Sequence, residues 1–342
     1  MALPIRKLDA LKDFFEIRIS SVVPVIPLKY DIFLLVNTKP TLFRRLGESI
    51  SSARISSLYH HGGETFLVPE AQRVLYLDSM KEKIQDPDTK AEEKAKYIKE
   101  SAFLHVNDLF TKTDVAPIVE ESHLLVDEMV KFVTSDISAV STLMRLSRHD
   151  YYTYNHCVDV AVYSIALARR AYGDDKEMLM RAGLGGLLHD IGKRDVRSEL
   201  INKTSALSPS EWEEIKQHPT HGKNCLEGVT CVPEESRKVV YQHHENFDGT
   251  GYPGNLMGDD ISSLARIVTI ADVFDALTTD RSYHKAMAPK DAMNMMFGMQ
   301  PGKFDPNLFK SFNKNFDKKP KVTLPKDFDP CTPQSVVKLF KK

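Results

Sequence analysis

The pattern of apolar and polar positions predicts a mixed N-terminal part of the chain. Residues 22–37, VVPVIPLKYDIFLLVN, are rich in β-branched and aromatic side chains interrupted by two prolines, which is typical of short strands. Residues 48–63 have a helical pattern that stops at a glycine pair, and residues 65–69, TFLVP, predict another short strand. We therefore expect a small α/β unit, a regulatory or protein-interaction module, over residues 1–80.

The pattern then becomes helical. Residues 81–117 are dominated by charged side chains, which indicates a solvated helical connector. Residues 123–133, HLLVDEMVKFV, have helical periodicity that puts Leu124, Leu125 and Met129 on one apolar face. We therefore expect an all-α domain over residues 118–317.

Two local signals support this division. Ser208 and Glu211 have the spacing of a capping box, with a proline between them at the first helical position. Residues 318–342 contain seven lysines, two acidic residues and four prolines, which predicts a basic tail. The expected fold class is mainly α, with a small α/β domain in front of the helical one.

Composition changes this picture little but excludes several classes of protein. The 342 residues contain 46 basic and 47 acidic side chains, and 42% are hydrophobic, as in ordinary globular proteins. This balance argues against disorder and against a protein that coats DNA. No apolar run approaches the roughly 20 residues of a membrane span, no secretory signal is visible, and the four cysteines form no CxxC pair. We expect a cytoplasmic protein without a DNA partner.

The histidines, in contrast, are unevenly distributed. Eight of the 12 lie between His149 and His284, and two of those are adjacent. They fall in or beside five short stretches: YNH ending at His156, LLHDIGK over residues 187–193, HPTHG over 218–222, HHENFDGTGYP over 243–253, and ADVFDALTTDRSY over 271–283. Histidine and carboxylate together suit Fe, Mn or Zn.

The HD pair within LLHDIGK has a specific geometric consequence. His189 and Asp190 are consecutive, so on a helix their side chains point about 100° apart and cannot chelate one ion together as i,i+4 histidines do. This spacing suits an aspartate that bridges two metal ions while its neighbour binds one of them. His243 and His244 have the same spacing at a predicted helix end.

In this order and spacing the stretches resemble the HD-GYP subgroup of the HD metal-dependent phosphohydrolases. The resemblance covers roughly residues 150–310, and HHENFDGTGYP is its most specific part, because ordinary HD phosphohydrolases lack it. It implies an all-α domain with a bi- or trinuclear metal centre and a cyclic di-GMP substrate. The implied enzyme hydrolyses cyclic di-GMP to linear pGpG, and in some cases onward to GMP, with a metal-activated hydroxide.

The resemblance also assigns roles to individual residues. The ligands of one metal correspond to His156, His189, Asp190 and Asp272, with Asp190 as the bridge, and those of the second metal to His218, His243 and His244. Lys193 is similar to a lysine that contacts the scissile phosphate or the attacking hydroxide, and Arg281 to a phosphate-binding arginine. Tyr252 and Gly251 belong to a loop linked to substrate contacts and to docking of diguanylate cyclase domains.

This sequence departs from the family pattern at two places. Trinuclear members carry a glutamate at the position of Tyr152, so two divalent ions, Fe or Mn, are expected here. The usual RPYRKA reads RSYHKA, so that His284 replaces a basic residue that helps to hold a phosphate. These departures keep two alternatives open: a catalytically weak receptor for cyclic dinucleotides, and a phosphohydrolase of another nucleotide.

Overall fold

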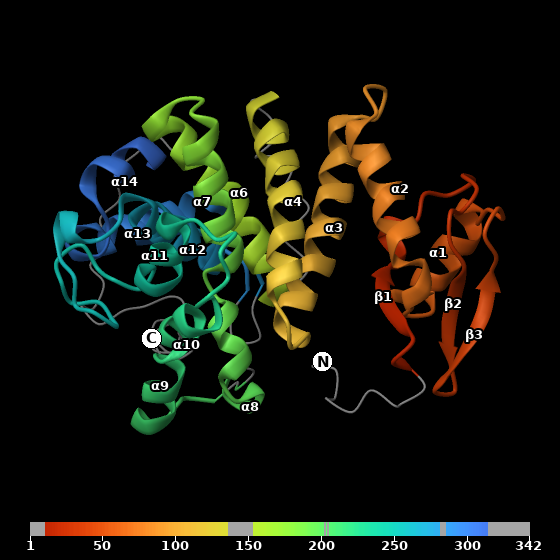
Figure 1. The fold of residues 1–342 in the computed structure, drawn as a ribbon, viewed down its shortest axis with the longest axis horizontal. Helices are drawn as coiled ribbons and strands as arrows, with labels where there is room; N and C mark the ends of the chain where they lie inside the picture. Colours follow the sequence, from red (N-terminus) through yellow and green to blue (C-terminus); the bar gives the residue numbers. More distant parts are fainter. Residues whose placement is uncertain (1–10, 136–152, 202, 204, 281–284, 314–342) are drawn as a thin grey trace. The chain divides into compact units, whose positions relative to one another are not determined.

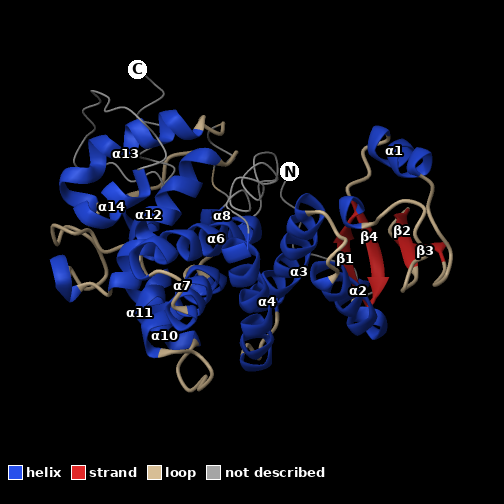
Figure 2. Ribbon diagram, turned by 90° about the horizontal axis from the view of Figure 1, so that it is seen from above, coloured by secondary structure: helices blue, strands red, loops and turns tan. Residues whose placement is uncertain are grey.

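The structure, a computed structural model, describes residues 11–135, 153–201, 203, 205–280 and 285–313. The chain divides into two units, residues 1–104 and 105–342. Among the described residues, every strand lies in the first unit (Figures 1 and 2). No helix within these ranges is long and apolar enough to cross a membrane.

The first unit is built on a four-stranded antiparallel sheet in the order β1-β4-β2-β3. The strands are β1 (Phe14–Arg18), β2 (Ile32–Val36), β3 (Lys39–Arg44) and β4 (Thr65–Pro69), and the helices α1 (Ser52–His60) and α2 (Arg73–Gln85) accompany them. Phe15, Ile17 and Phe66 are buried on one face of the sheet. The ring of Phe15 contacts the buried Tyr76 of α2 edge-to-face at 5.6 Å, which fixes the helix on this face.

The predicted α/β character of this unit is confirmed, with differences in detail. β2, α1 and β4 lie where the pattern indicated them, but residues 22–27 do not form a strand. Pro24 and Pro27 cannot donate to a sheet, and Val25 has a left-handed backbone with φ of 69°. β1 and β3 were not predicted.

The charged segment forms the long helix α3 (Ala91–Thr111). We expected it to be solvated, but Ala95, Ile98 and Ala102 are buried along one side of it. These three residues follow the helical spacing i, i+3, i+7. The helix is therefore amphipathic, although charged residues lie between the buried positions. Glu100 is also buried and pairs with Arg18 of β1 at 2.9 Å.

The second unit is helical, as predicted (Figure 1). Its helices are α4 (Ala116–Ser135), α6 (Thr153–Tyr172), α7 (Lys176–Leu188), α8 (Ser198–Ile201), α9 (Pro209–Ile215), α10 (His218–Cys225), α11 (Glu234–Gln242), α12 (Ser263–Thr278), α13 (Pro289–Lys303) and α14 (Pro306–Asn313). α12 lies at the centre and packs against α6, α7, α11 and α13. Almost every residue of α12 is buried, including the carboxylates Asp272 and Asp275.

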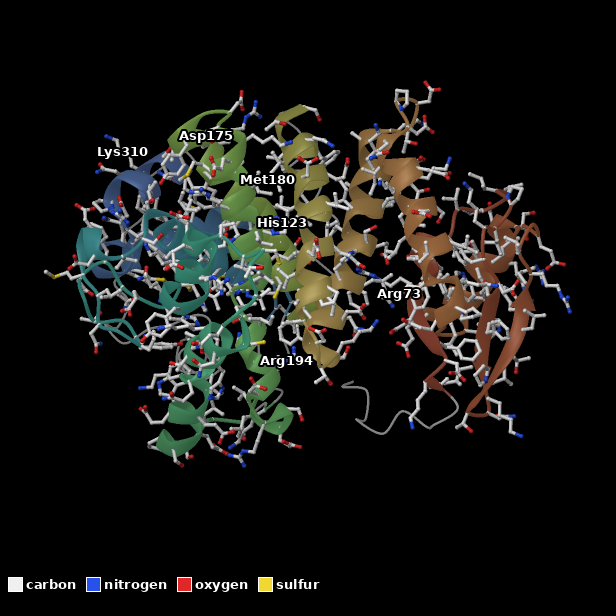
Figure 3. The ribbon with its side chains drawn as sticks, viewed as in Figure 1. Arg73, His123, Asp175, Met180, Arg194 and Lys310 are labelled. Atoms are coloured by element: carbon white, nitrogen blue, oxygen red, sulfur yellow. The ribbon has the colours of Figure 1, made fainter. Side chains whose placement is uncertain are left out.

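Local signals explain where several of these helices begin. The Asp175 carboxylate caps α7 by accepting hydrogen bonds from two backbone amides (Figure 3). The predicted capping box between Ser208 and Glu211 is present at the start of α9. On α4 the predicted apolar face is correct except for Leu124, which is 67% exposed because Val126 and Val130 complete the buried face instead.

The four predicted segments, residues 1–80, 81–117, 118–317 and 318–342, stay a prediction, and the tail lies outside the described residues. The boundary between the two units falls inside α3, after Leu104.

Candidate metal centre

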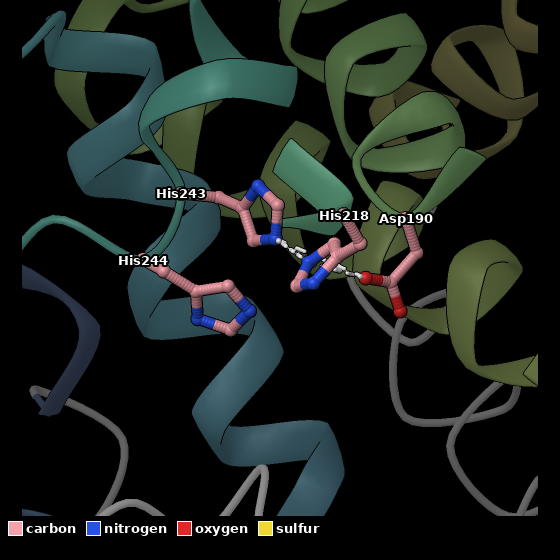
Figure 4. A group of neighbouring side chains, drawn as sticks. All are labelled: Asp190, His218, His243 and His244. Carbon is pink, nitrogen blue, oxygen red and sulfur yellow. Dashed lines mark hydrogen bonds and ion pairs between the residues drawn. The ribbon is translucent and has the colours of Figure 1, made fainter. Parts of the chain in front are cut away.

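All seven side chains predicted as metal ligands are buried in the second unit, and none is more than 7% exposed. They come from the ends or interiors of five helices and form two groups: His156, His189 and Asp272 in one, and Asp190, His218, His243 and His244 in the other. Within each group the candidate ligand atoms lie within 4.8 Å of one another. Figure 4 shows the second group, whose four side chains point toward one another.

Asp190 faces both groups with different oxygens. Its Oδ2 atom lies 3.4 Å from Nε2 of His189 and 3.8 Å from Nε2 of His156. Its Oδ1 atom lies 3.3 Å from Nε2 of His218 and 3.8 Å from Nε2 of His243. This is the arrangement that a bridging carboxylate requires.

Helix ends orient three of the imidazoles. Nδ1 of His189, of His218 and of His243 lies 2.8, 2.8 and 3.0 Å from the carbonyl oxygens of Gly186, Ile215 and Val240, respectively. These carbonyls belong to the last turns of α7, α9 and α11, where backbone acceptors lack partners within the helix. Because each Nδ1 donates its proton there, each Nε2 is left as an acceptor that faces the centre.

A carboxylate orients a fourth imidazole. Nδ1 of His156 lies 2.6 Å from Oδ2 of Asp275, which is one turn after Asp272 on α12. The hydroxyl of Thr279 donates to the other oxygen of Asp275 at 3.0 Å. Asp275 therefore orients this ring so that Nε2 of His156 is turned toward Asp272, whose Oδ1 lies 3.1 Å away.

Burial and neighbouring charges put these groups in the protonation states that metal binding needs. Burial lowers the pKa of His218 to about 4 and holds the pKa values of His243 and His244 well below the usual range. Burial alone would raise the pKa of Asp190, but its interactions with His189 and with the ammonium group of Lys193 hold it well below its usual range. At neutral pH the imidazoles with lowered pKa values are neutral and this carboxylate is ionised.

The candidate ligand atoms suit a divalent cation because they are hydrogen-bond acceptors that face one another. Nε2 of His218 and Nε2 of His243 are 3.2 Å apart, although both Nδ1 protons are already donated to carbonyls. Nε2 of His189 and Oδ1 of Asp190 are buried and accept no hydrogen bond from the described residues. Buried lone pairs in such an arrangement repel each other and lack solvation, and a cation between them removes both costs.

Lys193 reaches the site, but not for the reason that the sequence suggested. In a continuous helix, the spacing of four residues would place Lys193 on the same face as His189. Instead, α7 ends at Leu188 and Ile191–Asp195 form a 3₁₀-helix. With about three residues per turn, this segment brings Lys193 over Asp190. The Nζ atom lies 2.5 Å from Oδ2 of Asp190.

Two glycines that the sequence reasoning missed bring the motifs together. A Cβ atom on Gly192 would lie 2.0 Å from the carbonyl oxygen of His218 and 2.3 Å from the backbone nitrogen of Gly222. Only this close contact between the 3₁₀-helix and α10 lets Asp190 reach His218. The available signal was a glycine within each of the HDIGK and HPTHG motifs, at positions where glycine weakens a helix.

The HHENFDGTGYP segment forms a loop that folds back on its first residues. The Glu245 carboxylate accepts hydrogen bonds from the backbone of Gly254 and Leu256, and Asp248 accepts one from Thr250. Glu245 and Asp248 therefore organise the glycine loop, and they lie outside both candidate ligand groups. A Cβ atom on Gly251 would lie 2.2 Å from the backbone nitrogen of Asn246, so this position requires glycine.

The remaining residues are Arg281, Tyr152 and three histidines, His149, His221 and His284, that are not predicted to be metal ligands. Arg281 and His284 lie outside the described residues, as do Tyr152 and His149. His221 lies on α10 and belongs to neither ligand group found among the described residues.

Comparisons with known proteins agree with this geometry. The family model of the HD domain matches residues 143–308. A cyclic di-GMP phosphodiesterase of Pseudomonas aeruginosa is 38% identical over 60% of this chain and 50% of its own length. A 3'3'-cGAMP-specific phosphodiesterase of Vibrio cholerae is 38% identical over 48% of this chain and 35% of its own length. The chain thus spans half or less of these curated relatives.

A solved structure extends the similarity beyond the helical domain. Bd1817, an HDG"Y"P protein from Bdellovibrio bacteriovorus, aligns with a TM-score of 0.72 over 89% of this chain and 99% of its own, at 22% identity. At 22% identity, this similarity shows only that the two folds are alike. The fold and the buried His/Asp cluster define an HD domain. With the HHENFDGTGYP loop beside the cluster, the chain contains an HD-GYP domain.

The contact at Gly192 predicts a strong effect of a single methyl group. Gly192→Ala should lower the free energy of unfolding by about 3 kcal/mol, measured by urea denaturation, because the Cβ would overlap backbone atoms that cannot rotate away. Gly228→Ala is the control, since its Cβ meets nothing within 4 Å and only its φ of 79° is unfavourable, at about 1 kcal/mol. Equal losses in the two variants would contradict the packing argument.

The contact between Asp275 and His156 predicts weaker metal binding when the carboxylate is lost. Asp275→Asn should raise the dissociation constant for Mn²⁺ about 10–100-fold, measured by titration calorimetry, because Nδ1 of His156 loses its charged acceptor. Asp174→Asn, at a surface ion pair with Arg169, should leave it unchanged. An Asp275→Asn protein with wild-type affinity would show that the carboxylate does not orient the ligand.

Proposed function

We propose that this protein is a metal-dependent phosphodiesterase that hydrolyses cyclic di-GMP to linear pGpG. The observation that carries the proposal is Asp190, whose two oxygens face two separate groups of buried ligand atoms. The names of the relatives support the substrate class, since they are phosphodiesterases of cyclic dinucleotides. Because the chain spans only part of each relative, their activity is carried over here as part of the proposal.

The two groups would hold two divalent ions. His156, His189 and Asp272 would bind one ion and His218, His243 and His244 the other, with Asp190 shared between them. Mixed imidazole and carboxylate donors suit iron or manganese. Two such ions would acidify water and neutralise negative charge on the phosphoryl oxygens.

Lys193 brings a positively charged side chain of the protein itself to the site. Its side chain is 18% exposed and its ammonium group contacts Asp190, so it could turn from the carboxylate toward a phosphate of the substrate. Arg281 would bind the same phosphate. In the reaction, water adds to phosphorus, the bond from phosphorus to the 3'-oxygen breaks, and that oxygen takes a proton, which leaves a linear dinucleotide with a 5'-phosphate.

A different cyclic dinucleotide, 3'3'-cGAMP, is a second candidate substrate. The relative specific for 3'3'-cGAMP has the same 38% identity as the relative that acts on cyclic di-GMP, over a shorter segment. The loop that carries Gly251 and Tyr252 would contact the substrate and would be the place where a diguanylate cyclase domain docks. The first unit, residues 1–104, would act as the regulatory or interaction module.

The activity can be tested with protein loaded anaerobically with Fe²⁺ or Mn²⁺ and incubated with cyclic di-GMP. We expect linear pGpG by chromatography, no product after metal removal with EDTA, and a loss of about a thousandfold or more in kcat for Asp190→Asn, since a shared ligand contributes several kcal/mol of charge stabilisation. His60→Ala, at the exposed end of α1, should retain full activity. Absence of linear product with every metal would refute the proposed activity.

Substrate choice can be tested by competition. With cyclic di-GMP and 3'3'-cGAMP present together, we expect the higher kcat/KM for cyclic di-GMP, and the opposite ratio would assign the enzyme to 3'3'-cGAMP. Tight binding of either nucleotide without turnover would instead support a receptor, which is the remaining alternative.

A further inference from the structure

His244 is oriented differently from the other candidate ligand histidines. Four imidazoles have Nδ1 hydrogen-bonded to a carbonyl or a carboxylate, whereas the contacts that define the ring of His244 are aromatic. The ring of Tyr252 stacks on it with centroids 4.8 Å apart and planes at 25°. On its other sides His244 meets His218 edge-on at 5.0 Å and His243 at 4.2 Å.

The loop is built to hold Tyr252 in this position. The backbone nitrogen of Tyr252 donates to the carbonyl oxygen of His244 at 3.2 Å. Gly251 lets the chain lie against the backbone of Glu245 and Asn246, and the Glu245 carboxylate ties down the residues after Pro253. The same residue is therefore attached to His244 through both its backbone and its ring.

A second aromatic ring supports the stack from α9. Trp212 contacts Tyr252 edge-to-face at 6.1 Å, and α9 is itself anchored by its capping box and by the ion pair between Lys203 and Glu211. Trp212 is the single tryptophan of the chain. Its fluorescence can therefore report what happens at Tyr252 without any added label.

We propose that Tyr252 is a positioning residue for the metal ligand His244, and that its ring takes the place of the hydrogen bond that orients the other imidazoles. The stack limits rotation of the imidazole about its Cβ–Cγ bond and keeps one ring nitrogen directed at the group of Asp190, His218 and His243. This proposal rests on the metal centre of the proposed function, but not on the reaction or the substrate. It gives the tyrosine of the GYP loop a task that is separate from any contact with substrate.

The experiment compares Tyr252→Phe, which keeps the ring, with Tyr252→Leu, which removes it. Mn²⁺ is titrated into the full-length apoprotein, and bound metal is measured by elemental analysis after equilibrium dialysis. We expect Tyr252→Leu to weaken binding of one ion about 10–100-fold, the loss typical of groups that orient a ligand, and Tyr252→Phe to bind like wild type. Wild-type binding by Tyr252→Leu would overturn the proposal, as would equal weakening in both variants.

Trp212 fluorescence provides a second readout that general loss of structure would not imitate. Metal should change the emission of wild type and of Tyr252→Phe, and the change should be absent in Tyr252→Leu while its thermal unfolding stays cooperative. An unchanged metal response in Tyr252→Leu would also overturn the proposal.

A double-mutant cycle locates the effect. In the His244→Ala background, Tyr252→Leu should cause no further loss of metal, whereas in the His156→Ala background it should cause its full loss. A further loss without His244 would show that Tyr252 acts elsewhere. Metal binding that follows these expectations in a protein without phosphodiesterase activity would refute the proposed function and leave the role of Tyr252 supported.

Discussion

Mutual repulsion between buried acceptor atoms is the constraint on which the second unit depends. Imidazole nitrogens 3.2 Å apart, and a carboxylate oxygen 3.3 Å from one of them, lie inside a helical core where water cannot solvate them. Neutral histidines do not relieve this repulsion, because their protons are donated away from the centre. The arrangement is reasonable only around positive charge, and Lys193 provides part of it at one oxygen of Asp190. Metal ions would provide the rest.

Helix ends make such a cluster possible in an all-α domain. A ligand placed after the last turn of a helix can donate its Nδ1 proton to a carbonyl that the helix leaves unpaired, and no second side chain is needed to orient it. This explains why His189 and His243 stand at C-terminal caps and why the interior ligand His156 needs Asp275. His244 lies one residue beyond the C-cap of α11, and its ring stacks on the aromatic ring of Tyr252 in the loop instead of bonding to a helix carbonyl.

Helical periodicity was sufficient to predict that the second unit is helical, because periodicity is local in sequence. The seven candidate ligands were predicted from the resemblance that the five short stretches carry. Sequence patterns were insufficient where tertiary packing decides. The connector that was expected to be solvated buries one side of α3, and neither edge strand of the sheet, β1 or β3, was predicted. Lys193 reaches Asp190 through a 3₁₀ turn that the sequence did not reveal, and the contact between Gly192 and Gly222 joins segments 30 residues apart. The pairing of Tyr252 with His244 likewise depends on the closed shape of a loop.

The charge balance of the cluster links the proposed role of Tyr252 to substrate binding. Asp190, Asp272 and Asp275 bring three negative charges, and among the described residues Lys193 brings an ammonium group into contact with Asp190. One divalent ion would make such a site roughly neutral, and a second would make it positive by about two charges. A cyclic dinucleotide carries two phosphodiester charges, so a site with two ions would attract it much more strongly than a site with one ion. Orienting His244 would then govern substrate affinity through occupancy of the second ion. The near-neutral chain would in this way need no basic surface to bind an anionic substrate.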